Sequence, residues 1–219
     1  MSNSEILNQA LWLAIDQKDK TAVVQALGMG ANPNALHPYG CTTLHLWGHN
    51  WHDIEVLDIL LKAGSQINAR RTSDGQTALH ITISSVYTEA TEALIRNGAD
   101  VTVSDDFGET PLHRAAYLGN ERAAEELIAT GKVDLNAKNR DGQTPLYKSV
   151  VYGHSQNPIA AKILAAGANP NVKANNGDTV LDEASNRKHM NVMLLLLSNG
   201  AKMGKDIQAG RVHSAGVHL

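Results

Sequence analysis

Short apolar segments with helical spacing recur along this chain, and five of them end in a glycine. DILLKAG ends at Gly64, EALIRNG at Gly98, EELIATG at Gly131, AKILAAG at Gly167 and LLLLSNG at Gly200. Glycine adopts the left-handed conformation that closes a helix without the steric penalty that a side chain brings. The pattern therefore predicts a helix before each of these glycines.

A second pattern precedes each helix and has a glycine followed two residues later by a threonine. Its copies are GCTTLH at Gly40, GQTALH at Gly75, GETPLH at Gly108, GQTPLY at Gly142 and GDTVLD at Gly177, which begin 33 to 35 residues apart. Self-similarity at a fixed period of this size is typical of repeat proteins, in which each unit packs only on its neighbours. The sequence therefore predicts a stack of similar units.

The unit resembles the ankyrin repeat, which has about 33 residues, a hairpin-like turn, two antiparallel helices and a TPLHxA signature. Residues 110–113 with Ala115 reproduce this signature in full, and the other units keep part of it. The resemblance covers nearly the whole chain. It implies an all-α fold, an ankyrin-repeat solenoid of about six helix-turn-helix units joined by hairpin-like turns. It also implies that His45, His80 and His113 make local hydrogen bonds that tie neighbouring turns together.

The first unit is found by counting back from Gly30, which places Leu11 where the fourth unit has Leu112, with no TPLH before it. An atypical first unit is what a solenoid needs as a cap. We expect a single domain over residues 1–219. Its repeats are expected at approximately 4–37, 38–72, 73–105, 106–139, 140–174 and 175–205, followed by an irregular tail at 206–219.

Two units depart from the common length. The second has one extra residue near Trp51, and the fifth has two extra residues between His154 and Asn157, so that Pro158 is expected to begin a helix. Trp47 and Gly48 stand where the fourth unit has two alanines, which favours a large-for-small exchange in the core. Inserted residues often lie on the binding face of a repeat array. Trp51 and the loop at 154–156 are therefore secondary contact candidates.

Charge and composition exclude some classes of partner. The net charge is −3 and no dense run of Lys and Arg is present, so we expect no nucleic acid. The longest apolar run, residues 193–197, is far shorter than the roughly 20 residues that span a bilayer, and the N-terminus does not resemble a secretory signal. The single cysteine, Cys41, fits a reducing compartment. We expect a monomer that is cytoplasmic or delivered into a host cell, with no membrane partner.

The stretch HLWGHNWHD contains His45, His49 and His52, whose spacing would place them on one face of a continuous helix. A zinc site is one interpretation of this spacing. Packing and surface exposure are the favoured one, because His45 is a signature residue and the extra residue near Trp51 ends the helix before His52. Zinc would also need a fourth ligand nearby. We predict no metal and no cofactor.

Cys41 follows the signature glycine, where other units have Gln, Glu or Asp. We therefore expect it to be exposed at a helix N-terminus, where the thiolate is stabilised. A nucleophilic pair of Cys41 with His45 is an alternative, but His45 already has a role and no carboxylate is placed to orient it. Phosphate-binding loops, HExxH and CxxC are absent from the sequence. We predict no catalytic residues and no enzyme activity.

The resemblance implies that a partner binds the concave surface, formed by the turn tips and one side of each first helix. Positions that vary between units are free to serve recognition, and exposed aromatic residues near arginine are typical interface anchors. Among the aromatic residues, Trp12, Trp47 and Tyr147 fall at signature or core places. The predicted partner-binding residues are Tyr39, Leu46, His49, Trp51, Arg70, Arg71, Ile81, Tyr87, Asp105, Phe107, Arg114, Tyr117, Arg140, Lys148 and Tyr152.

The leading functional hypothesis is a non-enzymatic adaptor or regulator that binds another protein. Two alternatives remain open. The chain could be an inhibitor or immunity protein that occludes the active site of an enzyme or toxin. It could also be a host-directed effector or a substrate of asparagine hydroxylation, with Asn68 or Asn136 as the modified residue by resemblance to the family.

Overall fold

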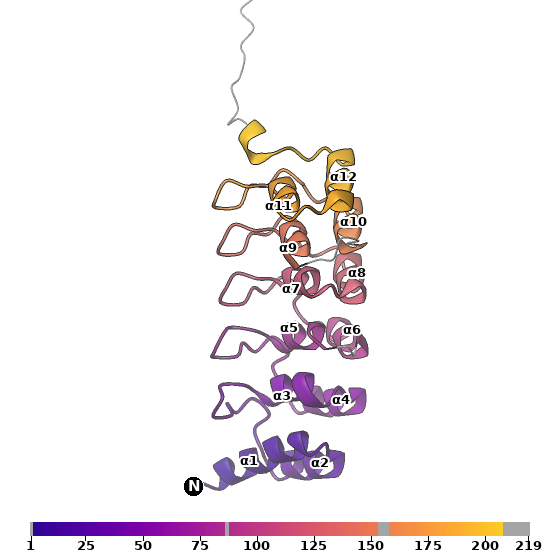
Figure 1. Ribbon diagram of the computed structural model, residues 1–219. Helices are drawn as coiled ribbons and strands as arrows, with labels where there is room; N and C mark the ends of the chain where they lie inside the picture. Colours follow the sequence, from indigo (N-terminus) through magenta and orange to yellow (C-terminus); the bar gives the residue numbers. More distant parts are fainter. Residues whose placement is uncertain (1, 86–87, 153–157, 208–219) are drawn as a thin grey trace, which may run out of the picture.

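The computed structural model describes residues 2–85, 88–152 and 158–207, which form one elongated stack (Figure 1). The described residues contain twelve α-helices, one short 3-10 helix and no strand. The helices are α1 (Asn3–Asp16), α2 (Lys20–Gly28), α3 (Thr43–Asn50), α4 (Ile54–Lys62), α5 (Ala78–Ile83), α6 (Thr88–Arg96), α7 (Pro111–Leu118), α8 (Glu121–Ala129), α9 (Pro145–Tyr152), α10 (Pro158–Ala165), α11 (Val180–Asn186) and α12 (Met190–Ser198), followed by η1 (Gly204–Asp206). The predicted all-α fold is confirmed.

The helices form two columns with a row of loops beside them (Figure 1). The odd-numbered helices, which are the first helices of their units, pack on one another from α1 to α11. The even-numbered helices form the second column. The hairpin-like loops project from the odd-numbered column, on the side away from the even-numbered helices. We call the outer ends of these loops, at residues 36–41, 70–76, 104–109, 138–143 and 173–178, the tips.

The glycines that were expected to close helices have the required backbone conformation. Gly64, Gly98, Gly131, Gly167 and Gly200 all have positive φ values, from 66° to 99°. An L-residue with a side chain rarely adopts this conformation, so the repeated glycine reflects a local requirement of the backbone.

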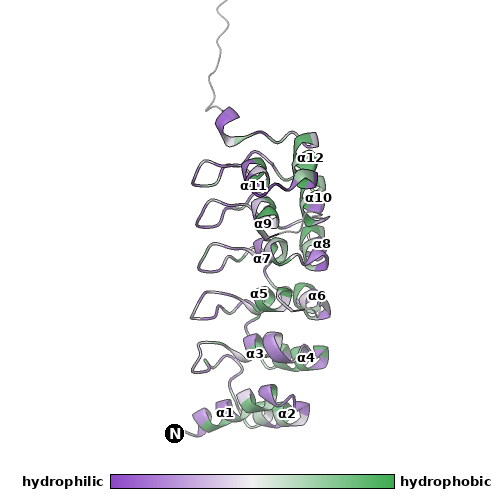
Figure 2. Cartoon of the chain, in the orientation of Figure 1, coloured by the Kyte–Doolittle hydropathy of each residue, from purple (hydrophilic) through white to green (hydrophobic). Residues whose placement is uncertain are grey.

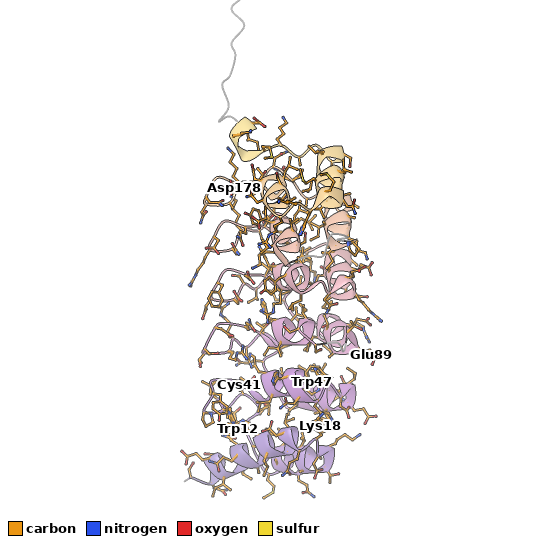
Figure 3. The ribbon with its side chains drawn as sticks, in the orientation of Figure 1. Trp12, Lys18, Cys41, Trp47, Glu89 and Asp178 are labelled. Atoms are coloured by element: carbon orange, nitrogen blue, oxygen red, sulfur yellow. The ribbon has the colours of Figure 1, made fainter. Side chains whose placement is uncertain are left out.

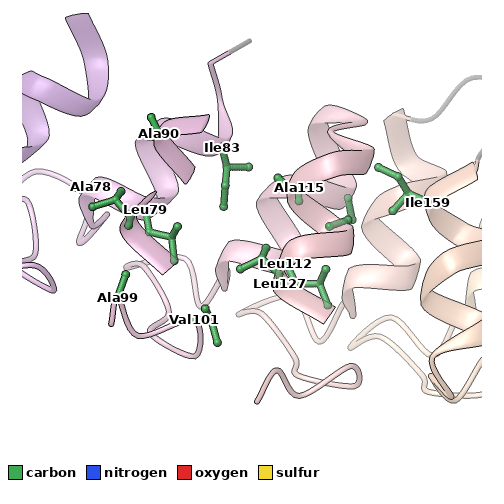
Figure 4. Close-up of a cluster of buried hydrophobic side chains, with 14 of the residues drawn as sticks. Ala78, Leu79, Ile83, Ala90, Ala99, Val101, Leu112, Ala115, Leu127 and Ile159 are labelled. Carbon is green, nitrogen blue, oxygen red and sulfur yellow. The ribbon is translucent and has the colours of Figure 1, made fainter. Parts of the chain in front are cut away.

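The core runs along the whole stack between the two helix columns. Leu79 of α5, Leu112 of α7 and Leu127 of α8 are each at most 1% exposed and belong to one continuous cluster of buried apolar side chains (Figure 4). Burying such a side chain stabilises the folded state by about 1.5–3 kcal/mol relative to leaving it exposed. The repeated leucine of the signature is therefore a packing residue.

The signature histidines link successive units, as expected. In His113, Nδ1 accepts a hydrogen bond from the backbone N–H of Thr110, and the opposite ring nitrogen, Nε2, lies 3.0 Å from the main-chain oxygen of Gln143 in the next unit. His45 and His80 repeat this arrangement with the main-chain oxygens of Gln76 and Glu109. Burial lowers the pKa of all three histidines from its ordinary value. They are neutral structural bridges between turns.

Two units replace the bridging histidine with another side chain. Tyr147 is 3% exposed and donates a hydrogen bond from its hydroxyl to Glu183. Burial, reinforced by the charge of Glu183, raises the pKa of Tyr147 to about 12. Asp182 accepts from the backbone N–H groups of Thr179 and Gly204, so it joins the sixth unit to the segment after α12. A link between units is kept although the residue type changes.

The second unit confirms the core exchange that its sequence predicts. Trp47 is fully buried, and its indole N–H donates to the main-chain oxygen of Asp53 at 2.8 Å. A Cβ added to Gly48 would lie 3.2 Å from the side chain of Thr82, so glycine permits α3 to lie close to α5 at this position. The extra residue lies where expected, because α3 ends at Asn50 and α4 begins only at Ile54.

The expectation for Cys41 is wrong. Its side chain is buried, with 7% of the residue exposed (Figure 3). Burial raises the pKa of the thiol above its ordinary value, although the charge of Arg71 opposes this effect. Since a thiol with a raised pKa is a poor source of thiolate near neutral pH, Cys41 lacks the activation that a nucleophile needs.

The fifth unit and the tail are described only in part. Pro158 begins α10, as predicted. The expected insertion at His154 to Asn157 and the tail from residue 208 onward lie outside the described residues.

Candidate protein-interaction surface

The tips are joined to one another by backbone hydrogen bonds. In each pair an N–H of one tip donates to a carbonyl oxygen of the tip before it, at 2.8–2.9 Å: Thr72 to Gly40, Asp106 to Asp74, Arg140 to Phe107 and Asn175 to Asp141. A Cβ on Gly108 would lie only 3.1 Å from Cα of Asn139, so glycine permits this close stacking. The tips therefore form a continuous row that holds its side chains at fixed spacing.

Two aromatic side chains stand out from this row. Tyr39 is 80% exposed on the first tip and Phe107 is 59% exposed on the third. The ring of Tyr39 lies 4.9 Å from that of His37, and His37 in turn lies 5.0 Å from the ring of Trp12 in an edge-to-face arrangement. Tyr39 is thus the outermost member of a group of three rings at the N-terminal end of the row.

The arginines of the second tip are held by aspartates. Arg70 pairs with Asp106 of the next tip, with 2.8 Å between Nη2 and Oδ1, and both side chains are nearly half exposed. Arg71 makes a bidentate contact with Asp74 within its own tip and is less exposed. Arg140 on the fourth tip is exposed. Positive side chains therefore lie beside the exposed Phe107 at a rigid spacing.

The first helices α7 and α9 add a charged and aromatic group. Nζ of Lys148 lies 2.6 Å from Oε1 of Glu109 and 4.6 Å from the centre of the Tyr117 ring. The side chains of Lys148 and Glu109 are only 12% and 14% exposed. Because Glu109 follows the tip glycine Gly108, this group connects the third tip to the helices. Arg114 extends it toward α5, since its Nε donates to the Ser84 hydroxyl at 3.0 Å.

The predicted partner-binding residues divide into exposed, partly buried and buried side chains, apart from two whose side chains are not described. Tyr39, His49, Arg70, Phe107 and Arg140 are exposed, and Leu46, Trp51, Arg71, Arg114, Tyr117 and Lys148 are partly buried. Tyr87 and the side chain of Tyr152 lie outside the described part of the chain.

Ile81 and Asp105 are buried, contrary to expectation. Ile81 is 7% exposed, and every residue of the short helix α5 is buried. Asp105 is 6% exposed because its carboxylate accepts from the backbone N–H groups of Phe107 and Glu109 and so closes the tip. Neither side chain is available to a partner in this conformation.

Sequence reasoning missed two contributors to this surface. Glu109 was not selected, although it holds Lys148 in place. Trp12 was assigned to the core, but it is only partly buried, and its ring contacts His37. Neither contact has a signal in the sequence, because the partners are about 25 to 40 residues apart in the chain.

The histidine-rich stretch does not form one face. His45 is buried with both ring nitrogens engaged, by Thr42 and by Gln76. His49 is exposed on α3. His52 lies beyond the end of α3 with φ of 62°, and its Nε2 lies 2.8 Å from the main-chain oxygen of Gly48. Across the described residues, no group of three or more His, Cys, Asp or Glu side chains is arranged to hold a metal ion.

Asn68 and Asn136 lie in the connections between units. The side-chain oxygen of Asn68 accepts from the backbone N–H of Asp100, and that of Asn136 accepts from the N–H of Asn169, both at 2.8 Å. Each asparagine thus fixes the start of the following connection.

The fold agrees with what comparisons with known proteins find. A family model described as ankyrin repeats (3 copies) matches residues 11–105, 87–174 and 112–207. The chain therefore belongs to the ankyrin repeat family, whose fold is one that mediates protein–protein interactions. Within the described residues, none of the helices is long and apolar enough to cross a membrane.

Individual relatives have varied roles. The chain is 32% identical over 174 residues to the chicken protein "Nuclear factor NF-kappa-B p105 subunit", covering 78% of this chain and 17% of that protein. It is 35% identical over 119 residues to the yeast "Probable 26S proteasome regulatory subunit p28", covering 53% of this chain and 51% of that protein. The chain thus spans about half or less of these relatives' lengths.

Two solved structures match a larger share of this chain than these relatives do. An ankyrin repeat domain from Acinetobacter baumannii superposes with a TM-score of 0.79 at 28% identity, covering 88% of this chain and 98% of that one. The ankyrin repeat domain of Bcl-3, described as a member of the IkappaB protein family, gives the same TM-score at 25% identity, with 88% and 86% covered.

Proposed function

We propose that this chain is a non-enzymatic module that binds another protein on the surface formed by its tips and first helices, which is the expected concave surface. The observation that carries the proposal is the pair of exposed aromatic tips, Tyr39 and Phe107, on a row fixed by backbone hydrogen bonds. A rigid aromatic side chain loses little conformational entropy on binding and buries a large area, so such residues act as interface anchors.

Charged residues around these anchors would set the orientation of the partner. Arg70 and Arg140 are exposed along the row of tips, and the largely covered Lys148–Glu109 pair lies between the third tip and the helices. Exposed charges such as these arginines contribute more to orientation and association rate than to affinity. The buried Cys41 and the fully engaged His45 support a role without catalysis. We also propose that the chain acts in the cytoplasm or in a host cell.

The test is affinity purification of the tagged chain from its native cell, compared among four variants. Tyr39→Ala, Phe107→Ala and Arg140→Glu change the proposed surface. Met29→Ala is the matched control, because Met29 is 70% exposed at the end of α2, in the helix column away from the tips.

We expect the wild type and Met29→Ala to retain one common partner that the three surface variants lose or bind at least about tenfold more weakly, which corresponds to about 1.4 kcal/mol. Equal recovery by all four variants, with unchanged unfolding midpoints, would contradict the proposal. If the purified partner is an enzyme, an activity assay with the bound chain then separates an inhibitor from an adaptor.

A further inference from the structure

The second tip contains two adjacent arginines, Arg70 and Arg71, followed by Thr72 and Ser73. Protein kinases select their substrates partly by the pattern of charges around the hydroxyl that they modify. A kinase with acidic side chains in its substrate groove favours a serine that has arginines two and three residues before it. Among the five tips, Ser73 is the one serine or threonine with both arginines at these places.

The backbone of this tip places Ser73 at its outer end. The N–H of Arg71 donates to the carbonyl of Gln76, five residues further on, whereas the equivalent bond of each other tip joins residues four apart. The second tip therefore has one extra residue. Inside this loop the N–H of Gly75 donates to the carbonyl of Arg71 at 2.8 Å, so Ser73 is the middle one of three enclosed residues. Ser73 is exposed, and Figure 2 shows the loop before α5 as mainly hydrophilic.

The hydroxyl of Ser73 is not engaged. Ser73 makes no hydrogen bond, through its backbone or its side chain, to any other residue of the described ranges. The neighbouring Thr72 differs, because its N–H donates to the carbonyl of Gly40 at 2.9 Å. The hydroxyl oxygen of Thr72 also lies where a side chain on Gly40 would begin. Of the two hydroxyls on this tip, that of Ser73 is therefore the one open to a kinase.

The two arginines can exchange their present partners for those of a kinase. Arg70 pairs with Asp106, and both side chains are nearly half exposed. Arg71 pairs with Asp74, and these side chains are 30% and 20% exposed. Ion pairs near the surface contribute little net stability, because solvent screens them and because two side chains must be held in place. Acidic side chains of a substrate groove can therefore replace both aspartates.

We propose that Ser73 is a phosphorylation site for a serine kinase directed by basic residues, and that the phosphate regulates binding at the tips. In this reaction Oγ of Ser73 attacks the γ-phosphorus of ATP and the bond from that phosphorus to the oxygen of the departing ADP breaks. The hydroxyl proton passes to the catalytic carboxylate of the kinase. The regulatory part rests on the proposed function, whereas the modification itself does not.

The phosphate reverses the charge of the second tip. This tip carries Arg70, Arg71 and Asp74, a formal charge of +1. A phosphoserine adds a charge of about −1.5 to −2 at neutral pH, so the tip becomes net negative. The tip lies between those of the exposed Tyr39 and Phe107. A partner that the tip arginines orient presents negative groups here, and like charges brought together reduce affinity. Phosphorylation should therefore weaken binding.

The first experiment treats the full chain with ATP, Mg²⁺ and the catalytic subunit of cyclic-AMP-dependent protein kinase, which prefers a serine after two arginines. Mass spectrometry then locates the phosphate. The double variant Arg70→Gln with Arg71→Gln removes the recognition pattern and keeps the serine. Arg140→Gln is its matched control, because it removes an exposed arginine from another tip. Circular dichroism confirms that each variant is folded.

We expect a phosphate on Ser73 in the wild type and in Arg140→Gln, and phosphorylation at least about tenfold slower in the double arginine variant. A wild type without phosphate on Ser73 overturns the proposal. A phosphate found only elsewhere, for example at Ser214, which has Arg211 three residues before it, overturns it too. Equal rates in the double variant and the wild type would show that the arginines do not direct the kinase.

The second experiment measures the affinity for the protein that the tagged chain retains, before and after kinase treatment. We expect the phosphorylated wild type to bind at least about tenfold more weakly, and Ser73→Ala to be unaffected by the same treatment. Equal or tighter binding by the phosphorylated chain overturns the regulatory role. The proposed function is judged separately, by unphosphorylated Tyr39→Ala and Phe107→Ala, and the location of the phosphate needs no partner. Failure of one proposal is therefore distinguishable from failure of the other.

Discussion

The imidazole of His113 lies between two turns, with Nδ1 3.2 Å from the backbone nitrogen of Thr110 and Nε2 3.0 Å from the carbonyl oxygen of Gln143. A backbone N–H can only donate, so Nδ1 accepts and the proton is on Nε2. In this neutral tautomer, Nδ1 accepts a hydrogen bond from a turn of the same unit and the N–H of Nε2 donates one to a turn of the next unit. The repeated histidine thus converts a local helix cap into a bond between units.

Removing this bridge should destabilise the fold. His113→Ala leaves the carbonyl oxygen of Gln143 and the N–H of Thr110 without their partner in a site that is fully buried, so we expect a loss of about 2–4 kcal/mol in the free energy of unfolding. Urea unfolding at neutral pH measures the loss. His49→Ala, on the exposed surface of α3, is the control and should change stability by less than about 0.5 kcal/mol. Equal stability of the two variants would contradict the bridging role.

The same histidines predict a pH dependence. Burial lowers the pKa of His45, His80 and His113 in the folded state, whereas the unfolded chain titrates near the ordinary value of about 6.5. The unfolded state therefore binds more protons below that pH, so stability is complete above it and falls as the pH decreases. Each histidine contributes a slope of up to about 1.4 kcal/mol per pH unit until its folded pKa is reached.

Urea midpoints measured between about pH 5 and pH 8 check this prediction. We expect a plateau above neutral pH and a decline in the acidic range before the carboxylates titrate. A midpoint that is constant down to pH 5 would show that the three buried rings do not resist protonation.

The sequence allowed the fold to be predicted because the requirements that define it are local. The positive φ at Gly64 and the threonine cap before His113 depend on residues only a few positions away. The same residue types therefore recur at a fixed spacing along the sequence. The burial of Trp47 was also predictable, because the fourth unit has the buried Ala115 at the same place.

The errors at the surface arose where contacts between units decide burial. The place of Cys41 has polar residues in other units, which favours exposure, yet Gln76 at the same place is only 8% exposed and receives a hydrogen bond from Arg71. Asp105 was predicted to contact a partner, but its carboxylate closes the tip. Residue type alone did not distinguish a polar side chain that faces solvent from one that bonds to backbone.

The burial of Cys41 predicts low reactivity. We expect a disulfide reagent such as dithionitrobenzoate to modify it slowly in the native chain and rapidly in urea, because the thiol is covered and its pKa is raised. Ser73→Cys in a Cys41→Ser background provides an exposed thiol on the neighbouring tip and should react at the rate of a free thiol. Comparable native rates for the two single-thiol chains would mean that Cys41 is accessible.

The ion pair between Glu109 and Lys148 should contribute more to the free energy of unfolding than the more exposed ion pair at the tips. Both side chains are largely covered, so Glu109→Gln leaves the Lys148 ammonium in a poorly solvated site, and we expect a loss of about 1–3 kcal/mol in the free energy of unfolding. The double variant Glu109→Gln with Lys148→Met should lose less than the sum of the two single losses, since no unpaired charge remains. Asp106→Asn removes the more exposed pair with Arg70 and should cost less than about 1 kcal/mol. Urea unfolding of the four variants measures these differences. If the coupling energy between Glu109 and Lys148 is no larger than the cost of Asp106→Asn, solvent screens both pairs alike and the prediction is wrong.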